Sequence, residues 1–185
     1  MCSTCLYGKK NTLGKNQALK DILYCLVIFS SYPNQTNLAI MKSDSKTPSV
    51  PINKEYLNNL TYQIIGCAIE VHKHLGPGLL ESTYEKCMIR ELNIRGLNCK
   101  TQQRIPLHYK GINLDAELRY DVLVEDLVVV ELKAIDGILP IHHAVVLTYM
   151  KMLAVPKGVI INFNCTNIYQ NGQRTFVNDL FASLP

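Results

Sequence analysis

Residues Val128–Ala134 read Val-Val-Val-Glu-Leu-Lys-Ala, an apolar run that only Glu131 and Lys133 interrupt. Successive side chains of a β-strand point to opposite faces, so these two charged side chains project from the same face. Charges within an apolar strand cost free energy unless they are paired or used in chemistry. This strand is therefore the first candidate for a functional site.

The segment before it, Arg119–Val124, carries Asp121 in a second strand-like pattern. If residues 125–127 form the connecting loop, Asp121 lies directly opposite Glu131, and the two Cβ atoms are about 4.5–5.5 Å apart. Two carboxylates at that separation could share a divalent cation such as Mg²⁺. A two-residue loop would shift the register and turn Asp121 away. The alternative is a cross-strand salt bridge in which Lys133 neutralises either Asp121 or Glu131. One lysine against two carboxylates would leave one negative charge unbalanced.

Periodicity places helices and strands along the rest of the chain. Apolar residues at three- and four-residue spacing predict helices over about residues 55–75, 79–95 and 141–153. Strand-like runs cover about residues 98–109, 112–124, 127–134 and 158–163, and a short hairpin around residues 170–172 closes the domain. The order α-α-β-β-β-α-β-β is typical of an α/β domain in which helices pack on a sheet.

The first 54 residues differ from the rest. They hold a formal charge of +5, whereas residues 55–185 sum to −1, so net charge does not support nucleic-acid binding by the domain itself. Residues 42–53 are polar and contain two prolines, which is typical of a linker. We predict a leader and linker over residues 1–54, either disordered or an over-extended gene start, and one domain over residues 55–185.

The compartment follows from cysteines and apolar stretches. The seven cysteines are odd in number and scattered, which indicates reduced thiols in an intracellular, cytoplasmic protein. Cys2-x-x-Cys5 lacks a second Cys or His pair at zinc-finger spacing. The longest fully apolar stretch, Ile22–Phe29, is too short to cross a bilayer, and no secretory cleavage site follows it.

A family resemblance appears when these segments are put in order. Gly78-Leu-Leu-Glu81-Ser-Thr-Tyr84, followed by Asp121 and by Glu131-Leu-Lys133-Ala, resembles the family named for its GxxExxY motif, within the PD-(D/E)XK nuclease superfamily. The likeness runs from about Tyr62 to Val177 and includes the segments Val71–His72, Leu75–Gly78, Tyr109–Gly111 and Ile161–Phe163. It implies a restriction-endonuclease-like core, in which helices flank a mixed sheet.

The resemblance also implies roles for single residues. Asp121, Glu131 and Glu81 would form an acidic cluster that binds Mg²⁺ or Mn²⁺. Lys133 would orient the attacking water and stabilise negative charge on a phosphate. The implied activity is hydrolysis of phosphodiester bonds in DNA or RNA. Taken alone, Glu81 is a first-turn carboxylate that the helix dipole favours.

Other polar residues are weaker candidates. Arg104 and Arg119 could contact substrate phosphates, although scattered strand charges are usually only solvated. Tyr149 could contact substrate, but an aromatic at the edge of the core is the more common role. Many relatives carry Gln where this chain has Val145, which cannot form a hydrogen bond with substrate. An inactive nucleic-acid- or protein-binding module and an enzyme acting on a small phosphorylated molecule therefore stay open as alternatives.

Overall fold

The computed structural model describes residues 51–114 and 118–185. The predictions for the leader, including Cys2, Cys5, Cys25 and the stretch Ile22–Phe29, lie outside these residues. By its contacts the chain divides at Ser45 and Lys46, and the fold described here is that of the second unit, Lys46–Pro185. None of the helices in residues 51–114 and 118–185 is both long enough and apolar enough to span a membrane.

Two helices open the domain close to where periodicity predicts them. Helix α2 spans Lys54–Leu75 and begins where the Asn53 side chain accepts a hydrogen bond from the Tyr56 amide at 2.7 Å. It ends at Gly76, which adopts a positive φ of 65°. Helix α3 spans Glu81–Ile94, starting two residues later than predicted because Leu80 is still extended.

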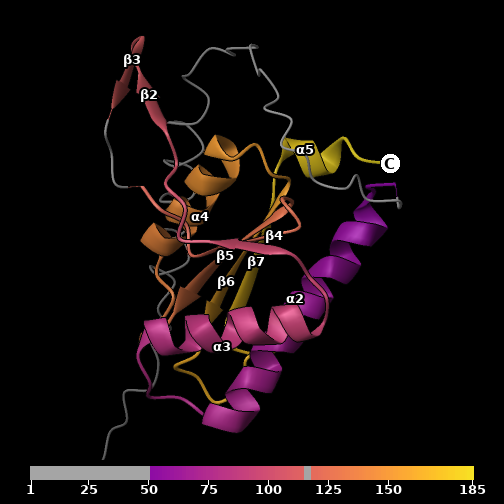
Figure 1. Ribbon diagram of the computed structural model, residues 1–185, viewed down its shortest axis with the longest axis vertical. Helices are drawn as coiled ribbons and strands as arrows, with labels where there is room; N and C mark the ends of the chain where they lie inside the picture. Colours follow the sequence, from indigo (N-terminus) through magenta and orange to yellow (C-terminus); the bar gives the residue numbers. More distant parts are fainter. Residues whose placement is uncertain (1–50, 115–117) are drawn as a thin grey trace, which may run out of the picture. The chain divides into compact units, whose positions relative to one another are not determined.

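A mixed five-stranded sheet forms the centre of the domain (Figure 1). Its strand order is β1-β4-β5-β6-β7, in which β5 and β6 are parallel and the other neighbours are antiparallel. Helix α4, Pro140–Met152, connects the parallel pair. The predicted α/β class with helices flanking a mixed sheet is confirmed. The strands are β1 Cys99–Thr101, β4 Val122–Val124, β5 Val128–Lys133, β6 Lys157–Asn162 and β7 Gln173–Val177.

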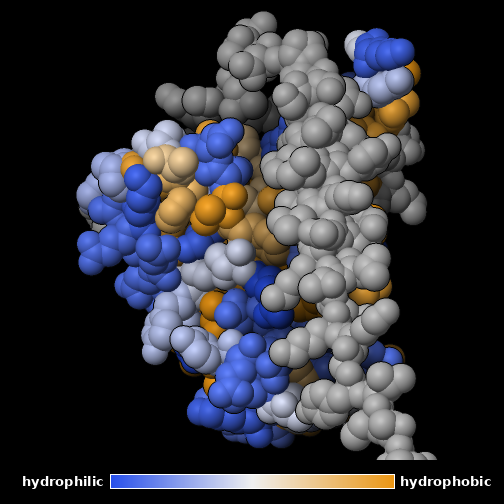
Figure 2. Space-filling view, turned by 180° about the vertical axis from the view of Figure 1, so that it is seen from behind, coloured by the Kyte–Doolittle hydropathy of each residue, from blue (hydrophilic) through white to orange (hydrophobic). Residues whose placement is uncertain are grey.

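The sequence prediction of two long strands over 98–109 and 112–124 is wrong in detail. Gln102 adopts a positive φ of 53° and Pro106 has no amide to donate, so the chain leaves the sheet after β1. It forms a separate hairpin of β2, Leu107–Tyr109, and β3, Ile112–Leu114, and returns at β4. The hairpin stands apart from the sheet in Figure 1, and hydrophobic and hydrophilic surface lie side by side on it in Figure 2.

The end of the domain also differs from the prediction. Strands β6 and β7 do form an antiparallel pair, but residues 163–172 connect them, instead of a tight turn at 170–172. A short helix that periodicity did not predict, α5, covers Asp179–Ala182. It begins where the Asn178 side chain accepts a hydrogen bond from the Phe181 amide.

The sheet separates two hydrophobic cores. Helices α2 and α3 cover one face, where the Tyr84 ring stacks on Phe163 with centroids 4.3 Å apart. Helix α4 covers the other face and approaches β6 closely (Figure 1). A Cβ added at Gly158 would lie 2.5 Å from Val146 Cγ1 and 2.7 Å from Met150 Sδ. A side chain at Gly158 would therefore push α4 away from the sheet.

Candidate active site

The register of β4 and β5 decides whether the two acidic residues meet. Val124 pairs with Val128, so residues 125–127 form the loop, as required for Asp121 to face Glu131. Asp121 lies one residue before β4, and its Oδ2 atom accepts a hydrogen bond from the Leu132 amide at 2.8 Å. The carboxylate of Asp121 is thus fixed against β5 beside Glu131.

Glu131 and Lys133 form the buried centre of the site. The Lys133 Nζ atom lies 2.8 Å from Glu131 Oε1 and donates to the Leu132 carbonyl at 2.9 Å. Glu131 is 7% exposed. Within residues 51–114 and 118–185, its second oxygen, Oε2, is buried and has no hydrogen-bond partner. Lys133 therefore does form an ion pair with a carboxylate, but within β5 and not across strands as the alternative predicted, and the pair satisfies only one of the two Glu131 oxygens.

The electrostatics of this centre are unusual. Burial raises the pKa of Glu131 to about 7, and the negative charge of Asp121 adds to the increase while Lys133 opposes it. Desolvation acts to lower the pKa of Lys133, but the hydrogen bond and charge of Glu131 and the charges of Glu81 and Asp121 outweigh it and raise that pKa. The site therefore keeps Lys133 cationic and favours a cation near Glu131.

The turn before α3 carries Glu81 to the same place. Gly78 adopts a positive φ of 101°. The buried Tyr84 hydroxyl donates to the Gly76 carbonyl at 2.6 Å and accepts from the Leu79 amide at 3.1 Å. Glu81 is the first residue of α3, as helix-dipole stabilisation favours, and its Oε1 atom lies 3.5 Å from Lys133 Nζ. The Gly-x-x-Glu-x-x-Tyr segment thus builds a fixed turn that presents a carboxylate to the lysine.

Two polar residues near the site were missed by the sequence reasoning. Glu85 lies one helical turn after Glu81, and the Gln102 side chain donates to Glu85 Oε2 at 2.8 Å. The same Gln102 nitrogen is 3.4 Å from Asp121 Oδ1. Burial and the charge of Asp121 raise the pKa of Glu85, although the Gln102 hydrogen bond opposes this. The four-residue spacing of Glu81 and Glu85 was the available signal, because such residues share a helix face.

The three predicted substrate-contacting residues differ in burial. Tyr149 is a half-buried residue of α4 that packs against the core, as predicted for an edge aromatic. Burial raises the pKa of its hydroxyl, and the negative charges of Glu131 and Asp121 add to this increase, so the ring lies within electrostatic reach of the site. Arg104 and Arg119 are exposed and paired by an isolated bridge at the base of the β2–β3 hairpin.

The histidines have structural contacts. His72 is half-buried, and its Nε2 atom lies 2.8 Å from the Cys165 carbonyl oxygen. His142 accepts a hydrogen bond from the Leu139 amide at 3.0 Å. His143 lies against Phe176 with ring centroids 5.2 Å apart. Both side chains are partly buried in the first turn of α4.

Comparison with known proteins adds an independent line of evidence. A sequence profile described as the PD-(D/E)XK nuclease superfamily matches residues 58–175, which include most of α2, all of α3 and the strands that carry the site. The chain belongs to the PD-(D/E)XK nuclease superfamily. Comparison with curated proteins and with solved structures yields no match. Glu131-Leu-Lys133 has the form of the (D/E)XK part of the superfamily's name.

PD-(D/E)XK nucleases typically use divalent metals, and the donors of this site fit such an ion. Asp121 and Glu131 offer carboxylates from neighbouring segments, and Glu131 Oε2 is unsatisfied in the described part of the chain. Mg²⁺ is usually held through one or two carboxylates and keeps several waters. Across residues 51–114 and 118–185, no three His, Cys, Asp or Glu side chains are grouped closely enough to hold a metal ion together. Glu81 as a third ligand therefore stays a prediction.

Proposed function

We propose that this chain is a nuclease of the GxxExxY type, which hydrolyses phosphodiester bonds of DNA or RNA with Mg²⁺ or Mn²⁺. The observation that carries the proposal is the buried Glu131 Oε2 atom beside Asp121 and Lys133, which has no hydrogen-bond partner among the described residues. A purely structural ion pair would be expected to satisfy both oxygens of such a buried carboxylate. The free cysteines of the described residues suit a reducing, cytoplasmic location.

The residues would divide the chemistry between them. Asp121 and Glu131 would hold the divalent ion, and Glu81 would add negative charge beside Lys133. When bound, the ion supplies a Lewis acid that polarises a phosphoryl oxygen. The Lys133 ammonium, kept cationic by its three acidic neighbours, would orient the attacking water and stabilise charge developing on the phosphate. Arg104, Arg119 and Tyr149 would contact the substrate around this centre.

One observation favours a second candidate, an inactive module that binds nucleic acid or protein. Val145 is a half-buried residue of α4, four residues before Tyr149, at the position where many relatives carry Gln. An aliphatic side chain there offers no hydrogen bond to substrate or to Lys133. The intact set of Asp121, Glu131 and Lys133 favours the enzyme.

The two candidates differ in their response to metal. A cation that binds only the folded protein stabilises it by about 2.7 kcal/mol at a hundredfold excess over Kd. We expect Mn²⁺ to raise the melting temperature of the wild type and Glu131→Ala to lose that response. Glu55→Ala, which changes an exposed glutamate of α2, serves as the control and should respond like the wild type. Calorimetry that detects no binding of millimolar Mn²⁺, with or without an oligonucleotide, would favour the inactive module.

A further inference from the structure

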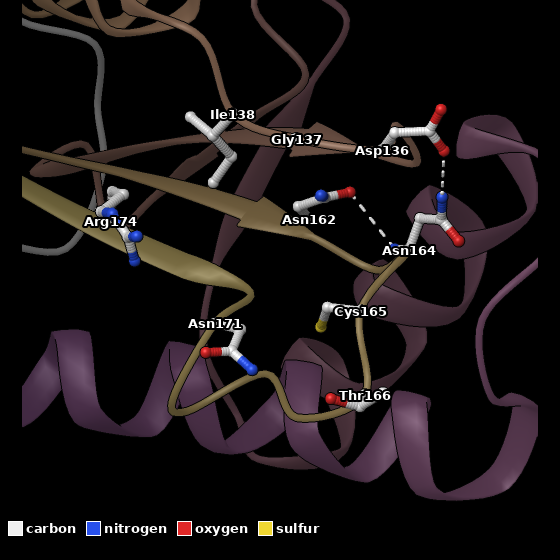
Figure 3. A pocket seen from close by; sticks show the side chains of 9 residues that line it. All are labelled: Asp136, Gly137, Ile138, Asn162, Asn164, Cys165, Thr166, Asn171 and Arg174. Atoms are coloured by element: carbon white, nitrogen blue, oxygen red, sulfur yellow. Dashed lines mark hydrogen bonds between the residues drawn. The ribbon is translucent and has the colours of Figure 1, made fainter. Parts of the chain in front are cut away.

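A polar cavity of about 380 Å³ opens at the carboxyl ends of the parallel strands β5 and β6 (Figure 3). Ligands of open α/β sheets commonly bind in the crevice beyond the carboxyl ends of the strands. The β5–α4 loop forms one wall of this cavity, and the β6–β7 connection with the start of β7 forms the other. The lining includes the side chains of Asp136, Ile138, Asn164, Asn171 and Arg174.

Hydrogen bonds fix the two walls to each other. The Asn162 side chain accepts from the Ile135 amide at 3.1 Å and donates to the Ile135 carbonyl at 2.7 Å. The Asn164 side chain donates to Asp136 Oδ1 at 3.1 Å, a contact drawn in Figure 3. A Cβ added at buried Gly172 would lie 2.7 Å from the Asn162 carbonyl oxygen, so the β6–β7 connection is tightly packed as well. The cavity is therefore pre-formed, as small-molecule sites usually are.

The lining combines the groups that recognise a nucleotide. Arg174 is exposed, and its guanidinium donates to its neighbour's backbone carbonyl at 2.7 Å. The ion pairs of the described residues do not include it, so its charge is available to a phosphate. Asn171 offers an amide that can both donate to and accept from a base edge. Ile138 supplies an apolar surface for the face of a base.

One row of paired residues across the sheet joins the acidic site to the cavity. Glu131 pairs with Ile160 on β6, and Ile160 pairs with Arg174 on β7, so the three residues form one row across the sheet. Side chains of such a row project from the same face. Neighbouring strands are about 4.7–4.9 Å apart, which places the Arg174 backbone roughly 10 Å from that of Glu131. The side chain of Ile160, in the middle of this row, is fully buried in the core under α4, so a substrate strand passes around α4 and spans more than this distance. At about 3.4 Å per stacked nucleotide, the path amounts to a few nucleotides.

We propose that this cavity binds one unpaired nucleotide of the substrate, a few nucleotides away from the bond that is hydrolysed. Arg174 holds its phosphate, Asn171 and Asn164 contact its base edge, and Ile138 lies against its base. A base inside a duplex is stacked and paired, so it cannot enter such a cavity without being extruded. The enzyme then prefers single strands or unpaired ends. The inference rests on the proposed nuclease function.

Binding without metal tests the cavity by itself. Each of the four nucleoside 5′-monophosphates is titrated into the full chain in EDTA, and the side-chain amide signals are followed by NMR. We expect the signals of Asn164 and Asn171 to shift for at least one nucleotide. Arg174→Ala should weaken that binding about 10- to 100-fold, as expected for a lost hydrogen bond to a charged group. The control Arg90→Ala changes an exposed arginine of α3 that does not line the cavity and should bind like the wild type.

Cleavage then separates failure of this inference from failure of the nuclease proposal. With Mn²⁺, Arg174→Ala and Asn171→Ala should raise KM for a single-stranded oligonucleotide while kcat changes little, and should reduce the preference over the matched duplex. Wild-type cleavage without that preference, or a preference that both variants retain, overturns the inference and leaves the nuclease proposal intact. Absence of nucleotide binding to the wild type at millimolar concentration also overturns it. If the wild type neither cleaves nor binds Mn²⁺, the proposed function itself fails.

Discussion

Glu131→Gln tests the electrostatics of the site through the pH dependence of stability. The pKa of the buried Glu131 carboxyl is raised from 4.5 to about 7 in the folded protein, mainly by desolvation. Between these values the folded carboxyl keeps a proton that the unfolded chain has released. The folded state then binds more protons than the unfolded state, so the free energy of unfolding falls as pH rises through this window.

The size of the effect follows from the shift. One pKa unit corresponds to about 1.4 kcal/mol, so the wild type should lose on the order of 3 kcal/mol from this residue as pH rises from about 4.5 to above 7. The raised pKa of Lys133 does not contribute in this window, because a lysine remains protonated throughout it. Gln has nearly the same shape and cannot ionise, so Glu131→Gln lacks this term.

The assay is urea denaturation of both proteins in EDTA over this pH range. Near the lower end the two stabilities should be similar, and above pH 7 Glu131→Gln should be the more stable protein by on the order of 3 kcal/mol. Glu55→Gln, a change at an exposed glutamate, should follow the wild type across the range. Equal pH dependence of the wild type and Glu131→Gln would refute the argument that Glu131 is desolvated and strained without a cation.

Three other substitutions or truncations give separate tests. Lys133→Met should abolish cleavage and keep Mn²⁺ affinity. If the free energy of unfolding instead falls by about 3–5 kcal/mol, measured by thermal or urea unfolding, the lysine serves only to neutralise a buried carboxylate. Tyr84→Phe removes the hydroxyl that joins Gly76 to Leu79 and should cost about 1–2 kcal/mol in urea unfolding, and an unchanged midpoint would show that this turn does not depend on it. A chain that starts at Met41 should unfold like the full chain, and a loss above about 1 kcal/mol would move the domain boundary upstream.

Local sequence rules predicted the parts of the fold that depend on periodicity. Alternation alone places Glu131 and Lys133 on one face of β5, and the loop length 125–127 sets the register that brings Asp121 opposite. The three-residue loop is built with Glu125 and Asp126 at positive φ, which no simple turn signature in this sequence indicated.

The missed features depend on the path of the chain between elements. Gln102 reaches Glu85 and Asp121 only because β1 ends early and the chain turns outward through its positive φ. Hydrophobic alternation continues through Pro106, so the pattern alone did not separate the β2–β3 hairpin from the sheet. Likewise, the cavity at Arg174 arises from two connections that meet in space, which strand patterns do not encode.

The central claim is that Asp121, Glu131 and Lys133 form a metal-dependent catalytic site for phosphodiester hydrolysis. The most direct measurement is cleavage of end-labelled single- and double-stranded DNA and RNA by the full chain, with Mg²⁺, with Mn²⁺ and with EDTA, alongside Lys133→Met. We expect cleavage of at least one substrate with the divalent ions, none in EDTA and none by Lys133→Met. Cleavage that persists in EDTA or in Lys133→Met, or no cleavage of any substrate by the wild type, would contradict the claim.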